Sequence, residues 1–284
     1  MKKQQFIVVA TGILLFTTLY FFGNTVSPKK KTISSGEEKR ATDKQLDIND
    51  ILAASESKLN GVQLAYVNRL KSAVVRGDVK NQQLSAYRQL ASFWKDSVQD
   101  AFLPAAYYLG ESAKLENSEK SLTFAAQLFL NNLQGQHPTL RAWMANQAKS
   151  LFERALQLNP QNDSAKIGLG GAYIFGGSAE NPQELMQGIQ QILEVARRDS
   201  TNMYAQLMLG LGGIESRQFD KAIERLGRVV RNQPANLEAI LALAEAFEQK
   251  GDKTDAVHWY EVGKKLVDNP DLRKEIDNRI KSLR

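Results

Sequence analysis

The chain has 284 residues, a length that allows one or two domains, and 43% of these residues are hydrophobic. It contains no cysteine, which excludes disulfides, zinc–cysteine sites and a lipidated N-terminal cysteine. The formal net charge is +6, but a cluster of positive charges follows an apolar N-terminal segment, so this excess does not by itself indicate a nucleic-acid surface.

The N-terminus has a basic leader, residues 1–5, followed by 17 uncharged residues from Phe6 to Phe22. As a helix this segment would be about 25 Å long, at the short end of the range for transmembrane helices. We therefore predict a transmembrane anchor over residues 6–22. A cleaved signal peptide is the alternative, although no clear small-x-small cleavage site follows the segment.

The charges around this segment leave its orientation open. Lys29, Lys30, Lys31, Lys39 and Arg40 follow it, and by the positive-inside rule they would keep the rest of the chain in the cytoplasm. A short basic leader before an apolar run is instead typical of bacterial export signals. We favour a single-pass protein of the bacterial inner membrane with its main domain in the periplasm. Residues 23–47 are polar and predict a disordered tether.

Residues 48–118 show apolar residues at helical spacing. The segments Leu64–Val75, Leu84–Val98 and Phe102–Leu115 each predict an amphipathic helix, with turns near Gly77 and Asp100. We interpret this region as degenerate helical repeats.

A first clearer repeat covers residues 119–162. Leu122, Ala125, Ala126 and Phe129 fit its first helix, helix A, and Ala148, Phe152 and Ala155 fit its second, helix B. About ten extra residues would then lie in the turn around Gly135 and Pro138. Alternatively, Leu109, Gly110 and Ala113 belong to helix A, and residues 118–133 form an extra helix.

The following repeats cover residues 163–202, 203–236 and 237–270. Leu209, Gly210 and Ala222 recur 34 residues later as Leu243, Ala244 and Ala256. The unit before them is six residues longer, and we place the extra residues in the turn 175–182. A fixed period of this length is the signature of stacked helix–turn–helix units.

These residues and their 34-residue register resemble the tetratricopeptide repeat (TPR) family. The resemblance implies an all-α fold, a right-handed TPR-type α-solenoid. A stack of repeats leaves an apolar end, so a capping helix is expected. Residues 271–284 fit that role, because they carry one apolar stripe formed by Leu272, Ile276, Ile280 and Leu283.

In the TPR family the concave face is lined by helix A, chiefly at positions 2, 5, 9, 12 and 13. Transferred by register, the resemblance implies a partner-binding groove with an apolar centre and an acidic C-terminal part, formed by Tyr204, Leu207, Leu211, Ile214, Glu215, Glu238, Leu241, Glu245, Glu248 and Gln249. Alternatively, Leu207 and Leu211 pack between repeats. The Lys and Asn pattern of TPR domains that bind chaperone C-termini is absent from these positions.

Nothing in the sequence predicts a catalytic, cofactor or metal site. The glycines around Gly170 and Gly210 lie in predicted helices rather than in a phosphate loop. His137 and His258 have no carboxylate or second histidine at ligand spacing. Arg225, Arg228 and Arg231 fit a solvated face of helix B, so we do not expect a nucleic-acid partner or a small-molecule substrate.

Three functions remain open from the sequence. The repeats and the anchor favour a membrane-tethered scaffold that binds a protein or peptide in its concave groove without catalysis. The same architecture resembles the chaperone-like TPR proteins of cytochrome c maturation, which is the alternative. An enzyme with its site in residues 48–115 has no supporting motif.

Overall fold

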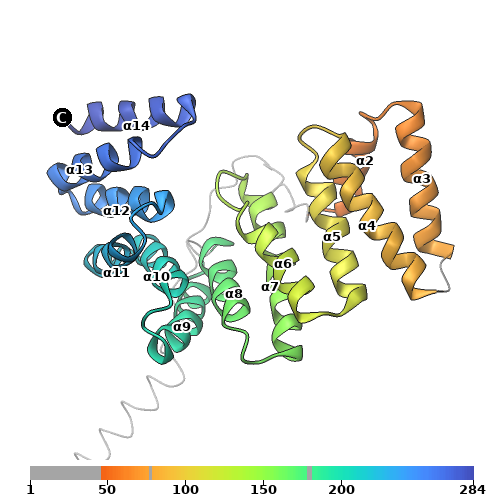
Figure 1. Ribbon diagram of the computed structural model, residues 1–284, viewed down its shortest axis with the longest axis horizontal. Helices are drawn as coiled ribbons and strands as arrows, with labels where there is room; N and C mark the ends of the chain where they lie inside the picture. Colours follow the sequence, from red (N-terminus) through yellow and green to blue (C-terminus); the bar gives the residue numbers. More distant parts are fainter. Residues whose placement is uncertain (1–45, 77–78, 178–180) are drawn as a thin grey trace, which may run out of the picture. The chain divides into compact units, whose positions relative to one another are not determined.

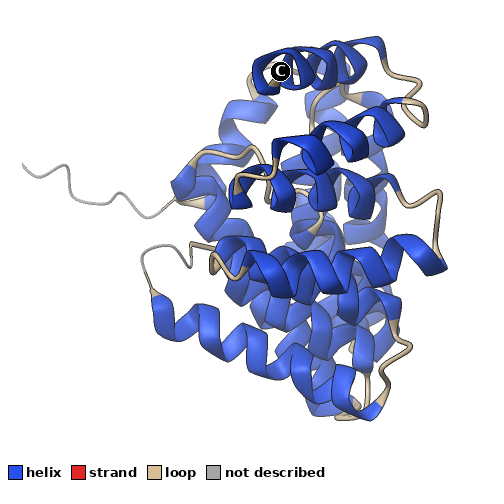
Figure 2. Cartoon of the chain, turned by 90° about the vertical axis from the view of Figure 1, so that its left-hand side faces the viewer, coloured by secondary structure: helices blue, strands red, loops and turns tan. Residues whose placement is uncertain are grey.

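The computed structural model describes residues 46–76, 79–177 and 181–284. The predicted leader, the predicted anchor and nearly all of the predicted tether lie outside the described residues. Within them, every regular element is a helix, so the all-α fold class is confirmed for this part of the chain (Figures 1 and 2). None of these described helices combines the length and the apolar character needed to cross a membrane.

Thirteen helices follow one another along the described chain. They are α2 (Ile48–Glu56), α3 (Gly61–Arg76), α4 (Lys80–Ser97), α5 (Phe102–Glu116), α6 (Glu119–Leu130), α7 (Pro138–Leu158), α8 (Asp163–Phe175), α9 (Pro182–Arg198), α10 (Met203–Glu215), α11 (Phe219–Asn232), α12 (Leu237–Lys250), α13 (Lys253–Lys264) and α14 (Pro270–Leu283).

The helices pack as successive pairs. The most extensive contacts join α4 to α5, α6 to α7, α8 to α9, α10 to α11 and α12 to α13. Each pair also contacts the next one along the chain, and α14 packs on α13. We therefore call α4, α6, α8, α10 and α12 the A helices and their partners the B helices.

Asparagine precedes the A helices α8, α10 and α12 as their N-cap residue. Its side-chain oxygen accepts a hydrogen bond from the backbone N–H three residues later, which satisfies one of the free donors of the first turn. An N-cap of this kind stabilises a helix by about 1 kcal/mol. The three pairs are Asn162 with Ala165, Asn202 with Ala205, and Asn236 with Ala239. Asn269 also caps α14, and this helix begins at Pro270, one residue before the predicted start.

The two irregular units take up their extra residues in longer B helices as well as in turns. In the first, α6 pairs with α7, and α7 has 21 residues where α11 has 14. In the second, Asn181 caps α9 and Pro182 occupies its first turn, where a missing N–H costs nothing. Helix α9 then has 17 residues. The insertions are therefore partly helical, whereas the sequence analysis placed them in turns.

The glycines of α8 allow close packing on three sides. A Cβ at Gly168 would lie 2.2 Å from the Phe152 ring of α7, and one at Gly170 would lie 2.5 Å from Ile192 of α9. At Gly171 it would lie 2.3 Å from a methionine side chain of α10. A neighbouring group would have to move to admit a methyl group at each position, and at Gly170 this includes the backbone oxygen of Gly188 at 2.7 Å. The helix therefore gives up about 1 kcal/mol of propensity per glycine in favour of close contact with its neighbours.

Candidate functional site

A groove lies along the A helices at the C-terminal end of the chain. It has a volume of about 280 Å³ and combines apolar residues with charged ones. We call it the C-terminal groove, and it is lined by Gln134, Leu211, Glu238, Leu241, Ala242, Glu245, Tyr260, Leu272, Glu275, Ile276 and Arg279. These residues come mainly from α10, α12 and α14, with Tyr260 from α13 and Gln134 from the loop after α6.

Four of the predicted partner-binding residues line this groove. Leu211 comes from α10, and Glu238, Leu241 and Glu245 come from one face of α12. Leu241 is held against α13 at Gly263, where an added Cβ would lie 2.8 Å from the leucine side chain. The apolar floor is therefore fixed by close packing between α12 and α13.

Three predicted residues are instead used for packing between repeats. Leu207 is only 6% exposed and belongs to the core cluster of α10 to α12, so it takes the alternative role considered for it. Ile214 packs against the same cluster. Tyr204 packs against the central core, and its hydroxyl is hydrogen-bonded to Gln127 of α6 at 3.0 Å. Burial raises the pKa of Tyr204.

The remaining three predicted residues are not among those that line the groove. Glu215 lines a separate small hollow of about 90 Å³, and Gln249 is exposed at the end of α12. Glu248 already has two partners, because Tyr260 donates a hydrogen bond to it at 2.7 Å and Arg279 of α14 forms an ion pair with it at 3.0 Å. Its charge is therefore largely satisfied within the protein.

The acidic side chains of the groove are partly desolvated. Burial raises the pKa of both Glu238 and Glu245 above the ordinary glutamate value. For Glu245, the nearby Arg279 guanidinium opposes this shift, while Glu215 and Glu248 add to it. Because burial disfavours the charged form, these carboxylates would gain from a cation that enters the groove.

Helix α14 also contributes residues to the groove, and these were not predicted. The 34-residue spacing of the repeats, continued into α14, would have identified them. Asp271 lies 34 residues after Leu237, the first residue of the last repeat. Counted from Asp271, positions 2, 5 and 9 are Leu272, Glu275 and Arg279, all of which line the groove. The capping helix therefore takes the place of a further A helix and completes the groove.

Comparison with known proteins agrees with the repeat architecture. The family model of the tetratricopeptide repeat matches residues 207–268, which include most of α10 and all of α11, α12 and α13. The chain contains tetratricopeptide repeats. No curated protein matches the sequence of this TPR protein.

Three solved structures are similar to this TPR chain. TTC0263, a TPR protein of Thermus thermophilus, has a TM-score of 0.51 at 16% identity and aligns over 72% of this chain and 98% of its own. MamA from Desulfovibrio magneticus RS-1 has a TM-score of 0.44 at 18% identity, over 65% and 94%. YrrB, described as a TPR protein with an unusual peptide-binding site, has a TM-score of 0.43 at 12% identity, over 76% and 99%. The likeness to the Thermus protein supports the TPR fold.

Two arginines of the B helix α11 interact with other side chains of the protein. Arg225 is half-buried and donates a hydrogen bond at 2.9 Å to the buried side chain of Gln206. Burial lowers the pKa of Arg225. Arg228 pairs with Glu224 one turn away on the same helix. Two of the three arginines noted in the sequence therefore have partners within the protein.

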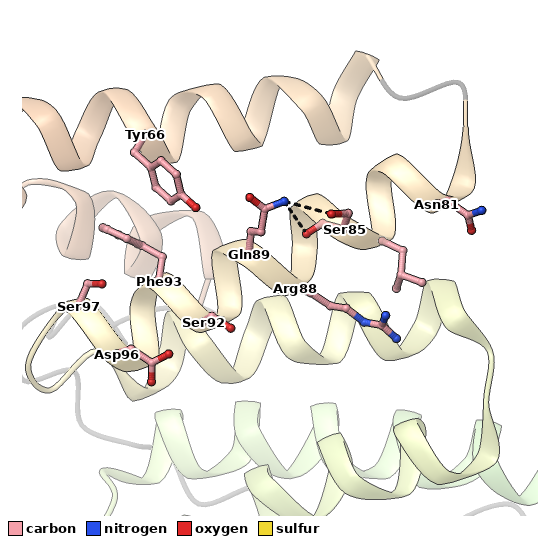
Figure 3. Close-up of a pocket in the computed structure, with 10 residues that line it drawn as sticks. Tyr66, Asn81, Ser85, Arg88, Gln89, Ser92, Phe93, Asp96 and Ser97 are labelled. Carbon is pink, nitrogen blue, oxygen red and sulfur yellow. Dashed lines mark hydrogen bonds between the residues drawn. The ribbon is translucent and has the colours of Figure 1, made fainter.

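A second hollow, of about 640 Å³, lies along α4 next to α3 (Figure 3). Tyr66 of α3 and Gln89 of α4 point into the space between these helices, and Gln89 donates a hydrogen bond to Ser85. The lining is polar, with one arginine and one aspartate among its ten residues. In the described part of the chain, no group of three or more acidic or histidine side chains is arranged to hold a metal ion.

Proposed function

We propose that this TPR protein is a non-catalytic scaffold that binds a basic segment of a partner protein in the C-terminal groove. The observation that carries the proposal is the combination of three carboxylates with an apolar floor. Glu238, Glu245 and Glu275 surround a floor that includes Leu241 and Ile276. Apolar side chains of a peptide would bury surface on this floor, while its Lys, Arg or amide groups would meet the carboxylates.

The electrostatics of the groove favour a cationic partner. Among the charged residues that line it, three are acidic and one, Arg279, is basic. Arg279 is already paired with Glu248, which is outside the lining. A cation would therefore meet the partly buried Glu238 and Glu245, whose pKa values are raised by burial.

The extent of the groove supports a peptide as its ligand. It runs along α10, α12 and α14, as an extended segment would require. The side chains of a peptide would enter it one at a time while the rest of the partner stays outside.

A binding measurement with defined peptides tests this function. The probe is a labelled peptide of alternating Lys and Leu with an amidated C-terminus, and its fluorescence anisotropy is followed with the purified full-length chain. The double variant Glu238→Gln/Glu245→Gln should bind it at least about tenfold more weakly, which corresponds to about 1.4 kcal/mol. The control variant Glu224→Gln/Glu261→Gln, on the B helices, should bind like the unchanged chain.

Salt and peptide charge provide the other arms of this test. Affinity for the Lys–Leu peptide should fall as salt is added, because screening weakens exposed charge pairs. A matched Glu–Leu peptide should not bind at the C-terminal groove. Equal affinity of the Glu238→Gln/Glu245→Gln variant for the Lys–Leu peptide would contradict the proposed groove function.

The proposed scaffold is also tethered to a membrane. The apolar segment Phe6–Phe22 and its basic leader support a single-pass anchor in a bacterial inner membrane, with the TPR domain on the periplasmic side. The full-length protein should then resist carbonate extraction, begin at or near Met1, and be digested by protease added to spheroplasts. A soluble form that begins near residues 24–28, or protection of the TPR domain in spheroplasts, would contradict this tethering.

A further inference from the structure

A second groove lies along the A helices near the other end of the described chain. It has a volume of about 700 Å³ and lies between α4, α5 and α6. We call it the N-terminal groove, and it is lined by Arg88, Ala91, Ser92, Trp94, Lys95, Val98, Asp100, Ala101, Phe102, Ala105, Leu109, Phe124 and Leu128. The sequence analysis proposed no site here.

The groove exists because two neighbouring A helices stand apart. From α6 to α12, consecutive A helices touch directly: α6 contacts α8, α8 contacts α10, and α10 contacts α12. Between α4 and α6 this contact is nearly absent. The floor of the space is instead formed by α5, with Ala105 in its first turn and Ala101 immediately before it among the lining residues.

The wall of this groove leaves a large aromatic side chain in solvent. Phe124 of α6 is 65% exposed, although the groove beside it is apolar. Leu128, one turn further along α6, lines the same wall. An exposed aromatic next to an apolar groove is typical of binding sites, because its burial by a partner would contribute most of the binding energy.

The opposite wall is basic. Arg88 and Lys95 lie two turns apart on α4, and Asp100 is the single acidic residue in the lining. Arg88 pairs with Glu116 at 3.0 Å, and in Figure 3 its side chain points away from α3. Lys95 has no ion-pair or hydrogen-bond partner among the described residues. The charge of this lining is therefore opposite in sign to that of the C-terminal groove.

We propose that the N-terminal groove binds an acidic amphipathic helix of a partner protein. The apolar stripe of that helix lies on Phe124, Leu128 and the alanines of α5. Its acidic residues lie along α4 and face Lys95. They also face Arg88, which is already paired with Glu116. The partner helix thus fills the place where the missing contact between A helices would be.

The shape of the groove favours a helix over other apolar ligands. From Arg88 to Lys95 the groove extends over about two helical turns, or roughly 10 Å. Its walls are helix surfaces, which pack against another helix by placing ridges of side chains into grooves. A partner with apolar residues at positions i, i+4 and i+7 has the matching spacing.

A pair of designed helical peptides tests the proposal. The first carries Leu at i, i+4 and i+7 with Glu on one flank, and the second has Lys in place of each Glu. Binding is measured by fluorescence anisotropy to the full-length chain in phosphatidylcholine nanodiscs, so that no detergent competes for the groove. Both peptides are measured with the Glu238→Gln/Glu245→Gln variant, which lacks the carboxylates proposed to bind basic peptides at the C-terminal groove. In this variant the Glu peptide should bind, and the Lys peptide should bind at least about tenfold more weakly.

Two substitutions in the groove separate its apolar and charged contributions. Phe124→Ser should weaken binding of the Glu peptide about tenfold or more, as expected for loss of an aromatic anchor. Lys95→Glu should weaken binding of the Glu peptide and strengthen binding of the Lys peptide. Met186→Ser and Lys253→Glu are matched controls at exposed positions outside both grooves, and they should leave affinity unchanged.

The outcomes also separate this proposal from the proposed function of the C-terminal groove. Glu238→Gln/Glu245→Gln should bind the Glu peptide normally, whether or not the C-terminal groove binds basic peptides. Unchanged affinity in both Phe124→Ser and Lys95→Glu would overturn the proposal. It would equally be overturned if a fatty acid, dodecanoate, bound in a Phe124-dependent way and the Glu peptide did not bind.

Discussion

The two grooves lie along the same series of A helices, but they are built in different ways. In the C-terminal groove, α10 and α12 touch each other and α14 adds a third wall, so acidic side chains from three positions of the register converge. In the N-terminal groove, α4 and α6 stand apart and expose apolar surface and a basic wall. The contact between α10 and α12, with α14 as a third wall, thus leaves a narrow charged groove, whereas the gap between α4 and α6 leaves a wider apolar one.

A difference in packing can be seen by comparing a glycine of α8, where consecutive A helices touch, with a glycine of α5, which forms the floor of the N-terminal groove. At Gly170 of α8 an added Cβ would lie 2.5 Å from Ile192 and 2.7 Å from the backbone oxygen of Gly188. At Gly110 of α5 it would lie 3.6 Å from Phe129 and at a similar distance from a leucine, which is ordinary contact. Both glycines are buried within helices, so the same substitution tests how tightly each region is packed.

The largest expected effect comes from this pair of substitutions. Gly170→Ala should destabilise the protein by about 1–3 kcal/mol, because the backbone of α9 must move to admit the methyl group. Gly110→Ala should be neutral or stabilising by up to about 1 kcal/mol, because alanine favours the helix and fits the available space. Chemical denaturation of the two variants measures both changes. Equal destabilisation by the two substitutions would remove the contrast in packing between the two regions.

A second effect, on binding, depends on pH. Burial raises the pKa of Glu238 and Glu245, so both begin to take up protons as pH falls from neutral toward their raised pKa. The Lys–Leu peptide should therefore lose affinity in mildly acidic solution, by up to about tenfold if both charges are lost. The Glu238→Gln/Glu245→Gln variant should show a flatter pH profile.

The same two carboxylates affect stability with the opposite sign. A folded-state pKa above the unfolded value means that these groups favour folding at low pH, and this contribution is lost as pH rises through the folded pKa. Bound cationic peptide should offset that loss. A peptide affinity that rises on acidification would show that these carboxylates are not the ones that bind it.

The smallest effect concerns the ion pair that closes the C-terminal groove. Arg279→Gln removes the partner of Glu248, and the pair is partly exposed, so the loss of stability should stay below about 1 kcal/mol. The groove then becomes more acidic, and affinity for the Lys–Leu peptide should rise about two- to fivefold, or by less than about 1 kcal/mol. Lys274→Gln, on the same helix, is the control. Weaker binding by Arg279→Gln would indicate that Arg279 itself contacts the peptide.

The positions of the helices could be predicted from the sequence because helix formation depends on neighbours close in the chain. Asn162, Asn202 and Asn236 cap helices through residues three positions away, and the 34-residue spacing of Leu209 and Leu243 sets the register. Four of the ten residues that this register predicts to bind a partner line the C-terminal groove, and their role in binding stays a prediction. The same register, applied to α14, identifies Leu272, Glu275 and Arg279 as further residues that line this groove.

Only the tertiary structure decided which of these side chains remain accessible. Tyr204 is hydrogen-bonded to Gln127, which is 77 residues away, and Glu248 is paired with Arg279 of the capping helix. The gap between α4 and α6 likewise depends on how far two helices stand apart. The sequence by itself thus determined the helices and their register, which are local properties, while distances between helices decided where the protein has a surface to bind with.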